Sequence, residues 1–441
     1  MTNSSTRRIS RRALTQGAAI AGAGYASINI IGRNAMAQDA SPEASPIETI
    51  PFSSTIADRA TGDVRVSGFS SPAEQAIIDQ QIANINSKYP NLKVTFEPIA
   101  AEYLTKIQTD IAAGNAADVF MVQNEYAQDF LSREVLLAID DFVAEDGVNK
   151  DDFYAPLINA YTWQDKLYGL PKDWSPIGAV YDPAILNGAE FPTDWEGLRT
   201  LLQTLKDAND STALTLNPEL ARWIMFLYQA GGDILNDDAS QILLGDDASK
   251  TSLEYFHSLY ADGLTATPAD VGAEWPGDSF AKGLSSIVFE GNWLFPFLDD
   301  SAPGKAYAVA ELPAGPAGKG TPAFTNAFSI FSGSKNPEGA WTVVNYLTSN
   351  EGAALAGPLG LAIPPRHDLE QSYLSMFPER APYLSAGEYA TPAQYGVGGQ
   401  QFQTDTNAVL QALWAGQGDV DSSLQQIVDY ANSDIQLTSG S

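Results

Sequence analysis

The chain has 441 residues, with 24 basic against 54 acidic side chains and a formal net charge of −30 at pH 7. Such a negative surface repels nucleic acids and anionic lipid headgroups, which excludes both as expected partners. The chain has no cysteine and two histidines, which excludes disulfides and cysteine-ligated metals and gives no zinc-site pattern. We therefore predict neither a metal nor a cofactor.

Residues 1–37 have the features of a secretory signal. Arginine pairs at 7–8 and 11–12 precede a weakly apolar run at 17–31, and Ala35-Met36-Ala37 forms a small-residue cleavage site. The paired arginines and the modest hydrophobicity favour the twin-arginine route. An uncleaved anchor is the weaker alternative, because a spanning helix needs ~20 apolar residues. We expect an exported protein, periplasmic or extracellular, without a lipobox cysteine.

Residues 38–61 predict a disordered linker, because positions 39–46 are small, polar and interrupted by proline. From residue 62 the pattern changes to alternating strands and helices. The expected elements are strands at 64–67, 92–96 and 117–122, alternating with helices that begin at the capping box Ser71-Pro72-Ala73-Glu74 and end before Gly114. This order predicts an α/β fold with a parallel sheet and helices on both faces.

Ligands of such sheets bind beyond the carboxyl ends of the strands. The first strand is followed by Phe69 and Ser70, and the third by Gln123 and Asn124. Amides can both donate to and accept from sugar hydroxyls, which favours ligand contact for Gln123 and Asn124. Phe69 and Ser70 are equally compatible with an ordinary loop.

A second α/β region begins near Trp174. Residues 193–196 (TDWE) predict another capping box, which opens a helix through residue 205. A strand is expected at 287–289, followed by the turn Glu290-Gly291-Asn292-Trp293, and the run 336–338 (NPE) is expected to cap a late helix.

Several catalytic and metal-binding patterns are absent from the sequence. It contains neither G-x-x-x-x-G-K-[ST] nor G-x-S-x-G. The acidic stretch 146–152 superficially resembles a calcium loop, but its spacing does not follow D-x-[DN]-x-[DN]-G. We expect a solvated turn there.

The stretch 168–181 (YGLPKDWSPIGAVY) places Lys172, Asp173 and Trp174 just before a β-rich run. Asp and Lys can pair with sugar hydroxyls, and an indole packs on the C–H face of a sugar ring. Taken alone, the stretch is also compatible with a core strand that is entered by a surface loop.

Five sequence landmarks occur in the order found in one family. They lie at 114–120 (GNAADVF), 168–171 (YGLP), 291–293 (GNW), 312–316 (LPAGP) and 334–341 (SKNPEGAW). Through them the chain, from residue 64 to about 433, resembles the extracellular solute-binding proteins of ABC importers. The resemblance is to their carbohydrate-binding group, family 1, which is related to maltose-binding protein.

The resemblance implies a two-lobe periplasmic-binding-protein fold, each lobe a mainly parallel sheet flanked by helices, joined by a hinge. Closure of the lobes on a ligand would be a hinge motion. The implied N-terminal lobe comprises 62–173 plus 322–352, and the C-terminal lobe 174–321 plus 353–441. The implied crossings between lobes lie near 173–177, 322–324 and 352–357.

The resemblance also implies where the ligand is held. The full set of predicted ligand-binding residues is Phe69, Ser70, Gln123, Asn124, Asp173, Trp174, Trp223, Trp275, Glu290, Asn292, Trp293, Asn326 and Arg366. Core packing is an equal alternative for Trp223, because its helix is apolar, whereas Trp275 lies in a polar loop. Arg366 either contacts the ligand or braces the hinge.

The implied function is capture of a sugar, from monosaccharide to oligosaccharide, and its delivery to the permease of an ABC importer. We expect a monomer without enzymatic activity. A polyol or glycerol-phosphate compound is the alternative ligand, although a phosphate favours paired basic residues and only Lys172 and Arg366 lie near the predicted cleft. A secreted glycoside hydrolase is a weaker alternative, since Asp173 and Glu290 would have to act as carboxylates ~5–10 Å apart.

Overall fold

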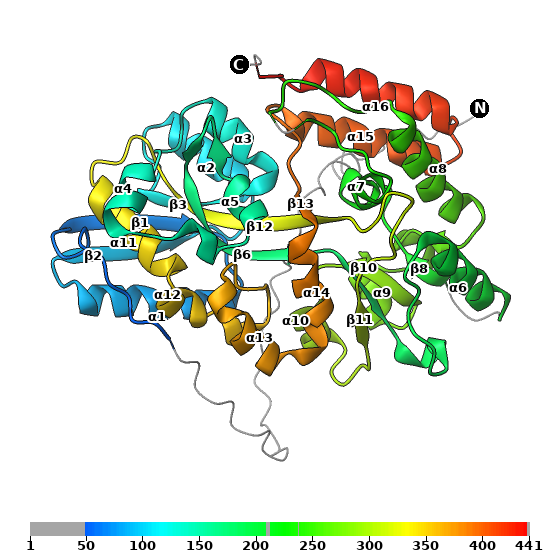
Figure 1. The fold of residues 1–441 in the computed structure, drawn as a ribbon, viewed down its shortest axis with the longest axis horizontal. Coiled ribbons are helices and arrows are strands. Elements are labelled where there is room, and N and C mark those ends of the chain that lie inside the picture. Colours follow the sequence, from blue (N-terminus) through cyan, green and yellow to red (C-terminus); the bar gives the residue numbers. More distant parts are fainter. Residues whose placement is uncertain (1–48, 209–211, 237, 439–441) are drawn as a thin grey trace, which may run out of the picture. The chain divides into compact units, whose positions relative to one another are not determined.

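The computed structural model describes residues 49–208, 212–236 and 238–438 (Figure 1). The predicted signal at 1–37 and the first part of the predicted linker, 38–48, lie outside the described residues. In the described part of the chain, no helix combines the length and the apolar character needed to cross a membrane.

The first sheet has six strands in the order β13-β12-β3-β1-β2, with β6 also paired to β12 (Figure 1). Its strands are β1 (Gly62–Gly68), β2 (Leu92–Pro98), β3 (Val119–Gln123), β6 (Gly169–Pro176), β12 (Thr321–Ile330) and β13 (Ala390–Pro392). Strand β1 is parallel to β2 and β3, and β12 is parallel to β13 but antiparallel to β3 and β6. The sheet therefore combines both kinds of pairing.

The second sheet has five strands in the order β11-β7-β10-β8-β9. Its strands are β7 (Gly178–Tyr181), β8 (Thr212–Thr215), β9 (Thr265–Ala266), β10 (Ser285–Glu290) and β11 (Ala308–Ala310). Strand β10 is parallel to β8 and antiparallel to β7. A separate hairpin consists of β4 (Thr162–Trp163) and β5 (Lys166–Leu167).

Helices connect and cover these strands. Up to the second sheet they are α1 (Pro72–Lys88), α2 (Tyr103–Ala112), α3 (Asn124–Ser132), α4 (Asp140–Asp146) and α5 (Ala155–Asn159). They continue with α6 (Trp195–Asp207), α7 (Leu220–Gln229), α8 (Asp247–Ala261), α9 (Pro276–Ala281) and α10 (Leu294–Ser301). The last are α11 (Pro337–Thr348), α12 (Asn350–Ala354), α13 (Glu370–Met376), α14 (Ala381–Ser385), α15 (Gly399–Trp414) and α16 (Val420–Asp434). Short 3-10 turns lie at Lys150–Asp152, Pro183–Leu186, Ala269–Val271, Gly357–Leu359, His367–Leu369, Pro378–Arg380 and Ala386–Glu388.

Local capping chemistry sets where several helices begin. The predicted capping box of α1 is confirmed, because Glu74 N donates to Ser71 Oγ and Ser71 N donates to the Glu74 carboxylate. For α6 the prediction needs correction: its cap is Asp194, which accepts from Gly197 N at 2.8 Å, and the helix continues to Asp207.

Each sheet has its own hydrophobic core. Val66, Phe120 and Trp341 lie in the core of the first sheet, and Leu214 and Ile287 in that of the second. Burying such apolar side chains contributes ~25 cal/mol per Å² of surface removed from water, so the chain needs no disulfide to hold either part.

The predicted lobe boundaries stay predictions, and strand β13 (Ala390–Pro392) departs from them. It lies in the stretch 353–441 assigned to the C-terminal lobe, yet it pairs with β12 in the first sheet. Local sequence could not indicate this pairing, because β13 is three residues long and its partner lies about 70 positions earlier in the chain.

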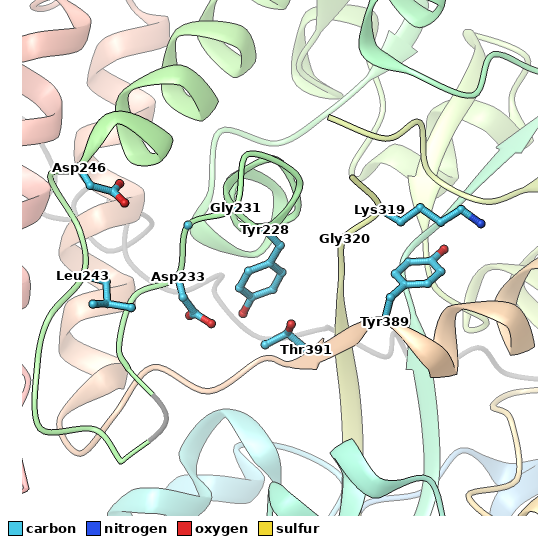
Figure 2. A pocket seen from close by; sticks show the side chains of 10 residues that line it. Tyr228, Gly231, Asp233, Leu243, Asp246, Lys319, Gly320, Tyr389 and Thr391 are labelled. Atoms are coloured by element: carbon cyan, nitrogen blue, oxygen red, sulfur yellow. The ribbon is translucent and has the colours of Figure 1, made fainter. Parts of the chain in front are cut away.

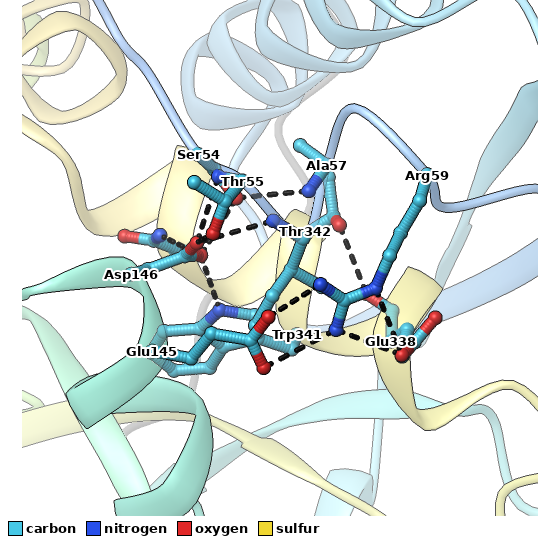
Figure 3. Close-up of polar contacts among 11 residues, drawn as sticks. Ser54, Thr55, Ala57, Arg59, Glu145, Asp146, Glu338, Trp341 and Thr342 are labelled. Carbon is cyan, nitrogen blue, oxygen red and sulfur yellow. Dashed lines mark hydrogen bonds and ion pairs between the residues drawn. The ribbon is translucent and has the colours of Figure 1, made fainter.

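The N-terminal segment 49–61 is ordered, which corrects the linker prediction for these residues (Figure 3). Within it Phe52 is 7% exposed and Ile56 fully buried, and both belong to the first core. Arg59 pairs with Glu145 and, at 2.9 Å, with Glu338. We call this stretch, 49–61, the N-terminal strap.

Asp146 fastens the strap and is not the solvated turn that the sequence predicted (Figure 3). Its carboxylate accepts six hydrogen bonds of 2.6–3.2 Å, from Ser54 Oγ, Thr55 N, Thr55 Oγ1, Ile56 N, Trp341 Nε1 and Asn345 Nδ2. Burial alone would raise the pKa of Asp146, but the hydrogen bonds from Ser54, Trp341 and the strap lower it overall.

Candidate functional site

Three predicted polar residues lie side by side on the first sheet. Gln123, the last residue of β3, is in register with Asn326 of β12, and Asn326 is in register with Asp173 of β6. Directly opposite residues of antiparallel strands share a face, so the three side chains project from the same face. Asn326 Nδ2 donates to Asp173 Oδ1 at 3.0 Å. We call Gln123, Asn326 and Asp173 the polar row.

Two charged residues flank the polar row at Asp173. Lys172 Nζ contacts the Asp173 carboxylate and lies 3.9 Å from Glu74 Oε1. Burial alone would lower the pKa of Lys172, but the carboxylates of Asp173 and Glu74 raise it overall. Lys172 is therefore a cation that is already neutralised by two carboxylates.

A second cluster forms where β10 ends. Glu290 is fully buried; its Oε1 accepts from Arg222 Nη2 at 2.8 Å and its Oε2 from Trp293 Nε1 at 2.8 Å. Burial raises the pKa of Glu290, and the Arg222 guanidinium limits that rise. One carboxylate thus holds both a guanidinium and a half-buried indole ring. We call Arg222, Glu290 and Trp293 the tryptophan cluster.

Strand β12 brings the tryptophan cluster to the polar row. The Trp293 ring meets the ring of Phe324 edge to face, with centroids 5.8 Å apart. Phe324 precedes Asn326 by two residues in β12, so both side chains project from one face. The turn requires Gly291, because a Cβ there would clash with the Trp293 ring and would lie 2.6 Å from Ser175 Oγ. The indole therefore folds closely over its own backbone.

Glu125, in the first turn of α3, is a titratable residue next to the polar row in sequence that the sequence analysis did not single out. Burial raises its pKa to about 7; the side chain of Gln403 and the charge of Arg222 lower it, and Glu219 raises it. These interactions place the carboxylate near α7 and α15, beside the tryptophan cluster. Its position two residues after Gln123 was a usable signal, whereas Arg222 and Gln403 carried none, since they come close only through the fold.

The pKa of Glu125 makes stability depend on pH. The folded pKa, about 7, exceeds the ordinary value of 4.5, so the contribution of Glu125 to stability is greatest in acid and declines as pH rises from about 4.5 to about 7. We expect Glu125→Gln to remove this decline and to stabilise the protein at pH 8 by up to about 3 kcal/mol, at ~1.4 kcal/mol per pKa unit. Urea unfolding of the variant and the wild type at pH 5 and pH 8 measures this difference in the free energy of unfolding. If the free energy of unfolding changes with pH in the same way in both proteins, the raised pKa of Glu125 is contradicted.

Three predicted tryptophans contribute differently from Trp293. Trp174 is 1% exposed and packs against Tyr154 with centroids 4.9 Å apart. Trp223 is fully buried in the second core. Both rings pack in a hydrophobic core, which for Trp223 is the core-packing alternative, and ligand contact stays a prediction for both. Trp275 is half-buried and meets Phe297 edge to face at 4.8 Å, so its role stays a prediction.

Three of the predicted polar residues form ion pairs or hydrogen bonds with other residues of the chain. Arg366 is buried and pairs with Asp152 at 3.0 Å and Asp368 at 2.7 Å. Asn292 is fully buried and donates to a tyrosine hydroxyl at 2.7 Å. Asn124 is 1% exposed, and its amide bonds to backbone groups. Internal contacts thus hold all three side chains, and ligand contact stays a prediction for them.

Phe69 and Ser70, the predicted ligand contacts after β1, contact neighbouring residues of the chain. Phe69 is partly buried and meets Tyr103 edge to face at 5.2 Å. Ser70 Oγ donates to Gln75 Oε1 at 3.1 Å. Both residues follow β1 at the sheet edge where the polar row lies, and contact with a ligand stays a prediction for them.

The described residues hold no group of three or more His, Asp or Glu side chains arranged for a metal ion. A cavity of about 330 Å³ lies away from the predicted residues, between the end of α7, the loop before β12, and β13 (Figure 2). Its lining includes Tyr228, Asp233, Lys319, Tyr389 and Thr391, none of which was predicted from the sequence.

Comparisons with known proteins agree with this architecture. The sequence profile of the bacterial extracellular solute-binding proteins matches residues 69–354, more than half of the chain. A maltotriose-binding protein from Pyrococcus abyssi is 22% identical over 288 residues, 63% of this chain and 61% of that protein.

Solved structures give the same fold. An ABC substrate-binding protein from Listeria monocytogenes in complex with cycloalternan has a TM-score of 0.75 at 22% identity, covering 85% of this chain and 98% of that one. The sugar-binding protein MalE from Xanthomonas citri has a TM-score of 0.75 at 18% identity, covering 84% and 97%. The predicted α/β, two-lobe binding-protein fold is confirmed, and the chain belongs to the bacterial extracellular solute-binding protein family.

Proposed function

We propose that the protein captures a sugar, from monosaccharide to oligosaccharide, between the tryptophan cluster and the polar row, and delivers it to an ABC permease. The observation that carries this proposal is the pairing of two surfaces on one side of β12. Trp293 offers a fixed indole face for sugar C–H groups, and Gln123, Asn326 and Asp173 offer hydrogen-bonding groups for hydroxyls.

The relatives support a carbohydrate as the ligand class. The similar proteins from Pyrococcus abyssi, Listeria monocytogenes and Xanthomonas citri are described with maltotriose, cycloalternan and sugar binding, respectively. We further propose that the chain acts outside the cytoplasm as a monomer, exported through the twin-arginine signal at 1–37.

The charges of the site disfavour an anionic ligand such as a glycerol phosphate. Arg222 lies 2.8 Å from Glu290 and 4.0 Å from Glu219, and Lys172 lies between Asp173 and Glu74. Each cation thus has two carboxylate neighbours, and a phosphate would have to compete with them. The same pairing speaks against glycoside hydrolysis, since Glu290 is buried and ion-paired instead of free to transfer a proton.

Thermal unfolding against a ligand panel tests the proposal. The panel holds maltose, maltotriose, maltotetraose, cellobiose and trehalose, with glycerol and glycerol 3-phosphate as non-sugar compounds. A ligand at ~100 times its Kd adds ~2.7 kcal/mol of stability, so we expect a higher Tm with at least one sugar. A shift with glycerol 3-phosphate alone would contradict the sugar class, and no shift with any compound would contradict the function.

Trp293 should carry much of the sugar affinity. We expect Trp293→Ala to raise the Kd for the stabilising sugar at least tenfold, because the variant loses the stacking face, and tenfold corresponds to ~1.4 kcal/mol. Calorimetric titration measures the change. Trp275→Ala is the matched control, since Trp275 is also half-buried but packs on Phe297. A larger loss in the control than in Trp293→Ala would transfer the stacking role to Trp275.

A further inference from the structure

Strand β12 changes its pairing partner along one edge. Residues Thr321–Ala323 pair with β13, and Asn326–Ile330 pair with β3. Strand β6 pairs with β12 from Ala323 to Ser329, so it occupies the other edge. Phe324 and Thr325 therefore lie where one partner strand has ended and the other has not begun. A backbone group facing that gap needs a partner from elsewhere.

The side chain of Asn124 fills this gap. Its Oδ1 accepts from Thr325 N at 3.1 Å, and its Nδ2 donates to Ala323 O at 2.9 Å and to Ala393 O at 3.2 Å. The side chain is 1% exposed. One primary amide thus continues the hydrogen bonding of β12 and ties it to the residue that follows β13.

The position of Asn124 in the chain links this contact to the site. Asn124 is the first residue of α3; Gln123 of the polar row precedes it and Glu125 follows it. On the other side it holds Ala323, in a stretch expected to cross between the lobes, and Ala393, just beyond β13. Asn124 therefore connects Gln123 of the polar row to the backbone of Ala323 and Ala393 through a single residue.

We propose that Asn124 is a positioning residue that couples sugar contact at Gln123 to movement of the hinge strands. This inference rests on the proposed function and deepens it. An amide suits the role because it offers two donors and an acceptor at once. An aspartate of the same shape keeps the acceptor for Thr325 N but turns an oxygen toward the carbonyls of Ala323 and Ala393. An alanine leaves all three backbone groups without this partner.

The experiment measures closure and affinity separately. The chain has no cysteine, so Lys93→Cys and Ala189→Cys, at exposed positions in the two predicted lobes, accept a donor and an acceptor dye cleanly. We expect each panel sugar that binds the wild type to change its energy-transfer efficiency. In Asn124→Ala and Asn124→Asp we expect that change to fall at least twofold and the Kd to rise at least tenfold; Asn124→Asp serves if the alanine variant does not fold.

Asn345→Ala is the matched control, because Asn345 is also a buried asparagine, 6% exposed, but donates to Asp146 away from the hinge. It should lower Tm and leave both the Kd and the energy-transfer change within twofold of wild type. If the Asn124 variants behave like this control, Asn124 is merely structural and the inference is overturned. If the wild type itself binds no sugar, the proposed function fails, and the inference fails with it.

Discussion

Asp146→Ala is expected to lower the free energy of unfolding by about 4 kcal/mol. The change removes the acceptor of six hydrogen bonds, four from the N-terminal strap and two from α11. Each donor left without a partner in a buried place costs ~1–3 kcal/mol, and water can reach only some of them. The loss should appear in urea unfolding of the chain from residue 38 onward.

The control for this variant lies in the same helix. Asp141→Ala removes the same kind of side chain from an exposed position of α4 and should leave stability nearly unchanged. The charge of Asp146 also predicts a pH dependence. Because its pKa is lowered on folding, its contribution is present above its ordinary pKa, 3.8, and is lost as pH falls through the folded value. A loss below 1 kcal/mol at pH 7 would contradict the fastening role of Asp146.

Glu290→Gln is expected to destabilise the protein by roughly 3–5 kcal/mol, the range measured when one partner of a buried ion pair is removed. The amide cannot replace both carboxylate oxygens as acceptors for Arg222 and Trp293, and the buried guanidinium is left with Glu219, 4.0 Å away, as its ion-pair partner. The indole also loses its fixed orientation, so sugar affinity should fall together with stability. Chemical unfolding and calorimetric titration of the same preparation measure both effects.

A substitution in an exposed ion pair is the control for Glu290→Gln. Lys250 lies 2.6 Å from Asp421 on the surface, and Lys250→Gln should change neither stability nor affinity noticeably. If Glu290→Gln unfolds at the same urea concentration as the wild type, the buried pair does not hold the tryptophan cluster in the way described.

Local sequence patterns predicted the parts of the fold that local chemistry decides. The cap of α1 at Ser71 and a strand near 117–122 follow from neighbouring residues; the structure has the cap, and its strand β3 runs from Val119 to Gln123. The ordered strap could not be predicted in this way. Phe52 and Ile56 are ordinary apolar residues, and their backbone partners lie far along the chain: Glu351 for Phe52 and Asp146, 90 positions later, for Ile56.

The residues of the candidate site also differ in how far the sequence could predict them. The end of a predicted strand pointed to Gln123, whereas Trp293 and Asn326 were expected from the family resemblance. Asn326 and Asp173 lie inside strands β12 and β6. Trp174 has the same local setting as Asp173, yet its ring turns into a core with Tyr154. Alternation explains the difference: neighbouring residues of β6 face opposite sides, and the sequence does not say which side is covered. Arg222 joined the site only through its ion pair with Glu290.

The central claim is that a sugar lies between Trp293 and the polar row, and a crystal structure with the stabilising sugar bound tests it most directly. We predict a sugar ring with its C–H face on the Trp293 indole and hydroxyls within hydrogen-bond distance of Gln123, Asn326 or Asp173. A sugar bound elsewhere, such as the cavity beside Tyr228 and Tyr389, with the Trp293 face unoccupied, would contradict the account.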